Sequence, residues 1–118
     1  MKLICTPLSK KAMSLLDVDA CPSTLLERLL LTNSEYLQLE KSGLFNIINT
    51  SLIKNIDDYE DEYIVAHKEL EQMLKILKKH SLPENPKLLE KLISINELAL
   101  DKETGVFSTS KETLKKTS

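Results

Sequence analysis

Hydrophobic residues recur at helical spacing most clearly between positions 58 and 80. The intervals between them are four, three, four, three and four residues, and the positions are Tyr59, Tyr63, Ala66, Leu70, Met73 and Leu77. Such intervals place side chains on one face of a helix. The pattern therefore predicts a helix from about Asp58 to His80 with a continuous apolar seam.

Helix-start signals predict two more helices near the beginning of the chain. The Thr-Pro pair at positions 6 and 7 has the order of an N-cap and a first-turn proline, which predicts a short helix to about Leu16. The next helix is expected to begin near Pro22 and to carry the stretch TLLERLLLT. Thr24 and Glu27 in that stretch have capping-box spacing.

Three further helices follow from similar signals. Thr32 and Glu35 repeat the capping-box spacing, so a helix is expected over residues 33–41. Residues 44–57 contain β-like apolar runs, but their polar positions recur at helical spacing, which favours a helix. An Asn-Pro pair opens the last helix, which ends near position 104. The stretches LLERLLLTN and LLEKLISIN match at five of nine positions, which two amphipathic helices of similar composition can do by chance.

Two short segments at the ends of this pattern are compatible with strands. They are residues 2–6, KLICT, and residues 106–110, VFSTS. The sequence leaves open whether they pair. Residues 1–105 are expected to form a single helical domain, and residues 106–118 a short strand or a frayed polar tail. The predicted fold class is mainly α: a compact bundle of about five to six helices, with this minor two-stranded β element as the only optional addition.

Composition supports a helical protein and excludes several partners. The 118 residues include 42% hydrophobic residues, no Trp and only two Gly. Leu, Glu and Lys favour helices, whereas barrels and sandwiches need aromatic, β-branched and turn-forming residues. The net charge of −2 lacks the basic excess that phosphate contacts require, so a nucleic-acid partner is not expected. No run approaches the roughly 18 apolar residues of a membrane span. The expected location is the cytoplasm.

Few residues have the spacing of a chemical site. Cys5 and Cys21 do not form a CxxC motif and are expected to be buried, reduced thiols. Cys21 precedes an expected helix start, where a thiol can have a lowered pKa. His67 and His80 are thirteen residues apart and match no metal motif. The two glycines cannot form a phosphate-binding loop. No catalytic, cofactor-binding or metal-binding residue is predicted.

The densest local feature is the acidic segment DDYEDEY. Carboxylates are favourable at a helix N-terminus, and Asp57 could serve as the N-cap of the 58–80 helix. Two or three acids would meet that need, so the surplus around the tyrosines predicts a partner-binding face, although both tyrosines also belong to the apolar seam and could face a core. The predicted partner-binding residues are Asp57, Asp58, Tyr59, Glu60, Asp61, Glu62 and Tyr63.

These observations favour a small, non-enzymatic protein-binding module. Its acidic face would complement a basic partner protein, as in an inhibitor, immunity protein or antitoxin. A homo-oligomeric structural or assembly protein that uses the Tyr59–Leu77 seam is the first alternative. A small enzyme or ligand-binding domain that uses Cys21 or His67 is the second.

Overall fold

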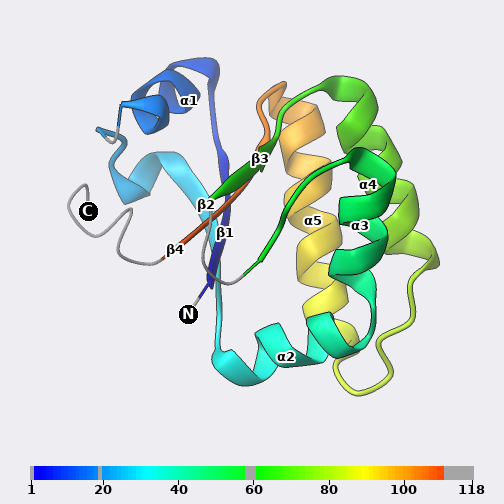
Figure 1. Ribbon diagram of the computed structural model, residues 1–118. Coiled ribbons are helices and arrows are strands. Elements are labelled where there is room, and N and C mark those ends of the chain that lie inside the picture. The colour runs from blue at the N-terminus through cyan, green and yellow to red at the C-terminus, as the bar shows by residue number, and fades with distance from the viewer. Residues whose placement is uncertain (1, 19, 58–60, 111–118) are drawn as a thin grey trace.

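The computed structural model describes residues 2–18, 20–57 and 61–110 (Figure 1). These residues form five α-helices and a four-stranded antiparallel sheet. The fold is therefore α+β. The prediction of a mainly α bundle with a minor two-stranded element is wrong, because two segments that carry helix-like patterns are strands.

The sheet has the strand order β2-β1-β4-β3, and every neighbouring pair is antiparallel. The strands are β1 (Lys2–Pro7), β2 (Leu26–Leu31), β3 (Glu62–Ile64) and β4 (Val106–Ser110). The two terminal segments do pair, as β1 and β4, but they form the centre of the sheet. Each has a further neighbour that the sequence pattern did not indicate.

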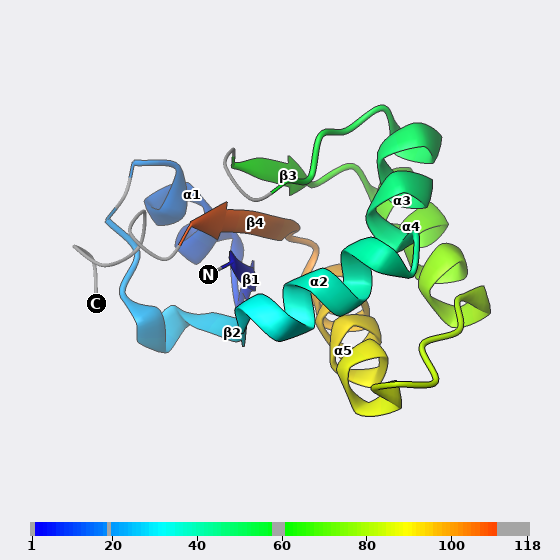
Figure 2. The ribbon, with the colours of Figure 1, turned by 60° about the horizontal axis from the view of Figure 1, so that its bottom comes forward.

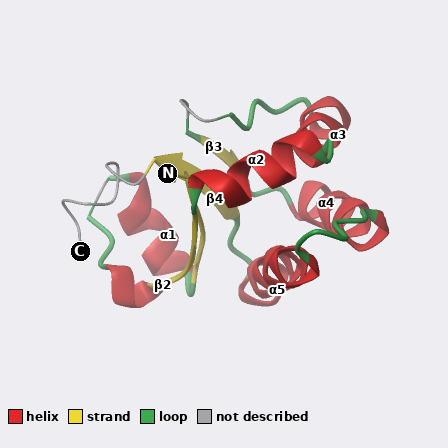
Figure 3. Ribbon diagram, turned by 90° about the horizontal axis from the view of Figure 1, so that it is seen from below, coloured by secondary structure: helices red, strands yellow, loops and turns green. Residues whose placement is uncertain are grey.

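Helices lie on both faces of the sheet. They are α1 (Lys10–Asp17), α2 (Asn33–Lys41), α3 (Leu44–Leu52), α4 (His67–Lys79) and α5 (Pro86–Lys102), and Ser23–Leu25 form a single 3₁₀ turn before β2. Figure 3 shows α1 on one side of the sheet and α3, α4 and α5 on the other. In the view of Figure 1, α2 crosses the bottom end of the sheet.

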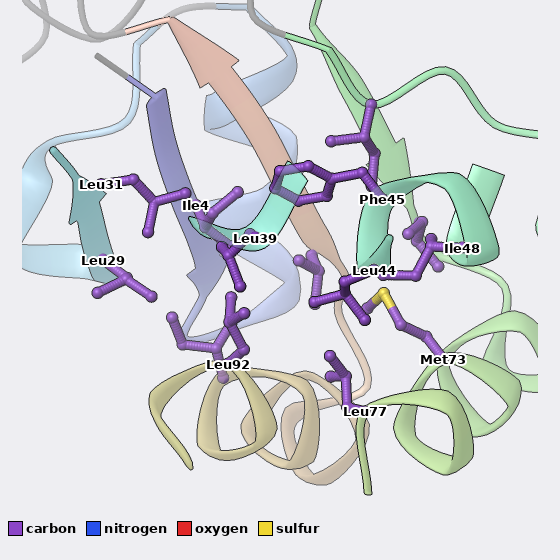
Figure 4. Close-up of a cluster of buried hydrophobic side chains, with 14 of the residues drawn as sticks. Ile4, Leu29, Leu31, Leu39, Leu44, Phe45, Ile48, Met73, Leu77 and Leu92 are labelled. Atoms are coloured by element: carbon purple, nitrogen blue, oxygen red, sulfur yellow. The ribbon is translucent and has the colours of Figure 1, made fainter. Parts of the chain in front are cut away.

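The sheet separates two hydrophobic cores of unequal size. Side chains alternate between the faces of a strand, so Ile4 of β1 enters the larger core while Leu3 and Cys5 enter the smaller one beneath α1. Figure 4 shows the larger core, where Met73 and Leu77 of α4 point toward the sheet. The α4 part of the predicted seam is thus buried inside the chain's own core.

The helices expected from the Thr32–Glu35 and Asn85–Pro86 signals are confirmed. At the start of α2, the Thr32 hydroxyl accepts from the Glu35 N–H (3.1 Å) and the Glu35 carboxylate accepts from the Thr32 N–H (2.9 Å), a complete capping box. Asn85 caps α5 by accepting from the Leu88 N–H (3.3 Å). The helix expected over 44–57 exists, but it ends at Leu52. No helix in the described part of the chain is long and apolar enough to cross a membrane.

The helix expected after Pro22 is wrong. Its apolar residues form strand β2, where Leu29 and Leu31 face the larger core and Leu26 faces the smaller one. Leu favours helices locally, but pairing with β1 over six residues and burial on both faces decide the conformation. The expected capping box at Thr24 does not form, because the helical part is limited to one 3₁₀ turn.

Two predicted helix starts are also wrong. Pro7 is the last residue of β1, and α1 begins at Lys10 behind Ser9, whose hydroxyl accepts from the Ala12 N–H (3.0 Å). The helix expected from Asp58 begins only at His67. The residues between them include β3, which pairs with β4 as the fourth strand of the sheet.

Candidate partner-binding surface

The structure places four of the seven predicted site residues. Asp57 ends the segment after α3, Asp61 directly precedes β3, and Glu62 and Tyr63 belong to β3. The other three, Asp58, Tyr59 and Glu60, lie outside the described residues. The helix-dipole explanation of these acids is wrong because α4 begins at His67, after all of them.

Glu62 has a structural role at the edge of the sheet. Its carboxylate accepts hydrogen bonds from the main-chain N–H groups of Asn55 and Tyr63, both at 2.9 Å. These bonds fasten the segment after α3 to the outer edge of β3. Glu62 is therefore held by the fold and is a poor candidate for direct partner contact.

The side chain of Asn49 in α3 also holds the segment after α3 in place. Its side-chain amide donates to the Ile56 carbonyl oxygen (3.1 Å), and its side-chain oxygen accepts from the Ile56 N–H (2.8 Å). This two-bond arrangement imitates strand pairing and satisfies both main-chain groups of Ile56. Together, Glu62 and Asn49 hold residues 53–57 beside β3.

Tyr63 does not face the larger core, as a seam residue would. It is 55% exposed, and its ring lies 6.0 Å from the Phe107 ring in a stacked arrangement. The Lys54 ammonium group lies 5.4 Å from the centre of the Tyr63 ring. Phe107 and Lys54 thus support the ring while more than half of the residue remains accessible to a partner.

Ile53 is a residue that the sequence pattern did not single out. It ends α3 in the left-handed conformation (φ 54°) and is 91% exposed. For L-residues this conformation costs roughly 1–2 kcal/mol, and β-branched residues adopt it rarely. Gly or Asn is usual at such a helix end. An exposed isoleucine at this position neither favours the backbone conformation nor adds to the packing of the core.

The Asn55–Glu62 hydrogen bond and the Lys54–Tyr63 contact join the segment after α3 to β3. We call five residues of these two adjoining segments the β3 face: Ile53, Asp57, Asp61, Tyr63 and Val65. Val65, directly after β3, is 40% exposed. The described chain around this face, residues 53–57 and 61–71, contains five carboxylates and two lysines, whereas the whole protein has a net charge of only −2. The β3 face therefore combines exposed apolar side chains with an acidic surrounding.

A hollow adjoins the β3 face at Asp57. Its volume is about 690 Å³, and it lies between α2, α3 and the segment that Asn49 holds in place. Tyr36 and Phe45, whose ring centres are 5.2 Å apart, are among the side chains that line it. Glu40 adds a second carboxylate to the lining. A partner that covers the β3 face could place a side chain here.

The two thiols are poor nucleophiles. Cys5 and Cys21 both lie in the smaller core. Burial raises the pKa of Cys5 to about 12, and burial also raises the pKa of Cys21. The alternative of a lowered pKa at Cys21 is not found, because only a three-residue 3₁₀ turn follows this residue and burial raises its pKa.

A serine–histidine contact links α2 to the end of α4. The His80 Nε2 atom lies 2.8 Å from the Ser42 Oγ atom. However, the Ser42 hydroxyl also donates to the Leu39 carbonyl oxygen (2.7 Å), which can only accept. Its single proton is thus used, so His80 Nε2 must donate to Ser42. A histidine that donates through this atom cannot act as the base for that serine, and the contact is structural.

The remaining histidine, His67, makes a surface contact with Glu71 (3.6 Å) one helical turn away. Within residues 2–18, 20–57 and 61–110, no group of three or more His, Cys, Asp or Glu side chains could hold a metal ion. Comparisons of this chain with protein-family models, curated proteins and solved structures give no match. The chemistry of the surface is therefore the basis for a functional proposal.

Proposed function

We propose that this protein is a small binding module that captures a basic protein through its β3 face. The observation that carries the proposal is Ile53. A residue that strains the backbone and leaves its apolar side chain in water reduces stability and solubility together. Contact with a partner is the physical benefit that explains its presence.

The surroundings of Ile53 support a basic partner. Carboxylates such as Asp61 would attract a positively charged surface and increase the rate of encounter. Ile53 and Tyr63 would then provide the desolvated contacts on which most binding energy depends. Because Lys54 and Phe107 already hold the Tyr63 ring, little side-chain entropy would be lost there on binding.

The biological class that fits this surface is an inhibitor, immunity protein or antitoxin. A protein that handles nucleic acids presents Lys and Arg side chains for phosphate contacts. An acidic face can form ion pairs with those Lys and Arg side chains and so block the nucleic-acid-binding site. The Tyr59–Leu77 seam gives less support to the homo-oligomer alternative, because its α4 residues Leu70, Met73 and Leu77 are already buried within the chain.

Site-specific photo-crosslinking in the native host tests the proposal. A photoreactive amino acid replaces Ile53 in one variant and Val18 in the control. Val18 is a matched position because it is also an exposed apolar residue (70% exposed) at the end of a helix, α1. The variant at position 53 should crosslink to a basic protein that the control does not reach.

A second change tests the electrostatic part. Asp61→Lys should weaken capture by about tenfold and reduce its sensitivity to salt. Glu62 is left unchanged in this test because its carboxylate holds the fold. Identical crosslinked products from positions 53 and 18, or capture that is unchanged by Asp61→Lys, would refute the proposal.

A further inference from the structure

The two edges of the sheet differ in how far their outward main-chain groups are covered. Strands β3 and β2 lie at opposite edges (Figure 2). β3 has only three residues, and Glu62 occupies its outward Tyr63 N–H. β2 has six residues, and no strand lies beyond it in the described part of the chain. Exposed edges promote unwanted pairing, so proteins usually cover them. An open β2 edge therefore calls for a functional explanation.

The hydrogen bonds identify the groups that the open edge presents. The Leu8 N–H donates to the Leu25 carbonyl oxygen (3.0 Å), and this pair continues the β1–β2 register. Bonded pairs alternate in antiparallel sheets, so Leu29 faces β1, while the main-chain groups of Arg28 and Leu30 point outward. Among described residues, none hydrogen-bonds to the N–H or C=O groups of Arg28 or Leu30.

A groove runs beside this edge. It has a volume of about 720 Å³ and lies between β2 and α5. Leu29, Ile95 and Leu98 contribute apolar side chains to its lining. Arg28 is exposed and is on the opposite face of the strand from Leu29, next to Leu30, which is 39% exposed. An added strand would thus find hydrogen-bonding groups at the edge and apolar contacts on both faces.

We propose that the β2 edge binds an extended segment of another protein, which adds to the sheet as a fifth strand. The segment would carry a carboxylate opposite Arg28 and apolar side chains toward Leu29 and α5. Arg28 has no ion pair with any described residue. Opposite charges across neighbouring strands are stabilising, so Arg28 selects an acidic residue at this position. Strand addition is an established mode of peptide recognition.

A second copy of this chain fits the edge less well. Two β2 strands related by a twofold axis place residues of the same face opposite each other. Registers centred on Glu27 or on Arg28 bring like charges together, which is destabilising. The register centred on Leu29 sets both charged residues against leucines. None of these arrangements gives Arg28 an opposite charge, whereas a different segment can.

The test uses two synthetic peptides and nuclear magnetic resonance. The first probe is the blocked peptide Lys-Val-Thr-Val-Glu-Val-Thr-Val-Lys, and its twin has Lys in place of the central Glu. On titration, the Glu peptide should shift the amide signals of residues 26–31 and of the groove-lining part of α5. It should bind about fivefold more tightly than the Lys peptide. Arg28→Glu should reverse this preference.

A matched pair of variants tests the hydrogen bonds. Leu30→Pro removes an outward N–H and no bond to β1, so the strand can tolerate it, whereas Leu30→Ala removes only side-chain atoms. Binding should be lost in the first variant and kept within about threefold in the second. If Leu30→Pro does not fold, the proposal is tested by the Arg28→Glu variant, which should bind the Lys peptide more tightly than the Glu peptide.

Three results would overturn the proposal. The first is the absence of shifts along β2 with the Glu peptide. The second is a preference that Arg28→Glu leaves unchanged. The third is a dimer in sedimentation experiments that Leu30→Pro abolishes, which would make a second copy the occupant. None of these results bears on the β3 face, because Leu30 and Arg28 lie at the other edge of the sheet.

Discussion

Replacing Ile53 with glycine should stabilise the protein and weaken its binding to a partner. The residue adopts a left-handed conformation at the end of α3 and exposes 91% of its surface. Glycine adopts this conformation without steric strain. The substitution therefore removes backbone strain and an exposed apolar side chain together, while the hydrogen bond from the position 53 N–H to Asn49 can remain.

The magnitude follows from two opposing contributions. Relief of the left-handed conformation should contribute about 1–2 kcal/mol. Glycine has more conformational freedom in the unfolded chain, which offsets about 0.5–1 kcal/mol. The isoleucine side chain buries almost no surface, so its loss contributes little to stability. The net gain in the free energy of unfolding should be about 0.5–1 kcal/mol, or about 2–4 °C in Tm for a chain of this size.

Ile53→Ala is the matched control. It removes the apolar side chain but keeps most of the strain, because alanine also has a Cβ atom. Thermal and denaturant unfolding should show a higher stability for the glycine variant than for the alanine variant, while both variants should bind the partner protein more weakly than the original protein. Equal stability of the glycine variant and the original protein would refute the strain argument. Unchanged capture by both variants would refute the anchoring role of Ile53.

Three other predictions concern the scaffold of the two surfaces. Asn49→Ala should lower the free energy of unfolding by about 1–3 kcal/mol by leaving two main-chain groups unpaired, whereas Asn46→Ala on the exposed side of the same helix should have little effect in denaturant titration. Gly105→Ala would place a Cβ atom 2.5 Å from the Val65 Cγ1 atom and should destabilise the protein by about 1–3 kcal/mol; an unchanged Tm would contradict this. The raised pKa of Cys5, about 12 against an ordinary 9.0, favours the folded state below pH 9 and should make stability fall between pH 9 and 12, an effect that Cys5→Ala should reduce in unfolding measured across this range.

The candidate site could be predicted only in part. The composition of residues 57–63 singled out the acidic segment, and the structure places Asp61 and Tyr63 at β3 and Asp57 at the end of the segment that Glu62 holds beside it. The role of Glu62 could not be predicted, because its partner Asn55 becomes a neighbour only when β3 joins the sheet. Ile53 had no clear sequence signal either, since its exposure depends on where α3 ends.

The open β2 edge could not be predicted from the sequence either. Edges exist only after the strands are ordered, and the residues that pair with β1 are at least nineteen positions away along the chain. Neither Arg28 nor Leu30 belongs to a recognisable motif. Their outward main-chain groups follow from the hydrogen-bonding register alone.

Local signals in the sequence by themselves determined the helices over residues 33–41 and 86–102. Their caps at Thr32 and Asn85 satisfy main-chain groups within one turn and need no distant partner. Only the tertiary structure decided which secondary structure the stretches LLERLLLTN and LLEKLISIN adopt, because they share five of nine residues. The first contains strand β2 and the second lies within helix α5. Helix propensities differ by only about 0–0.7 kcal/mol per residue for ordinary amino acids, so pairing with β1 and burial between two cores outweigh them in the first segment.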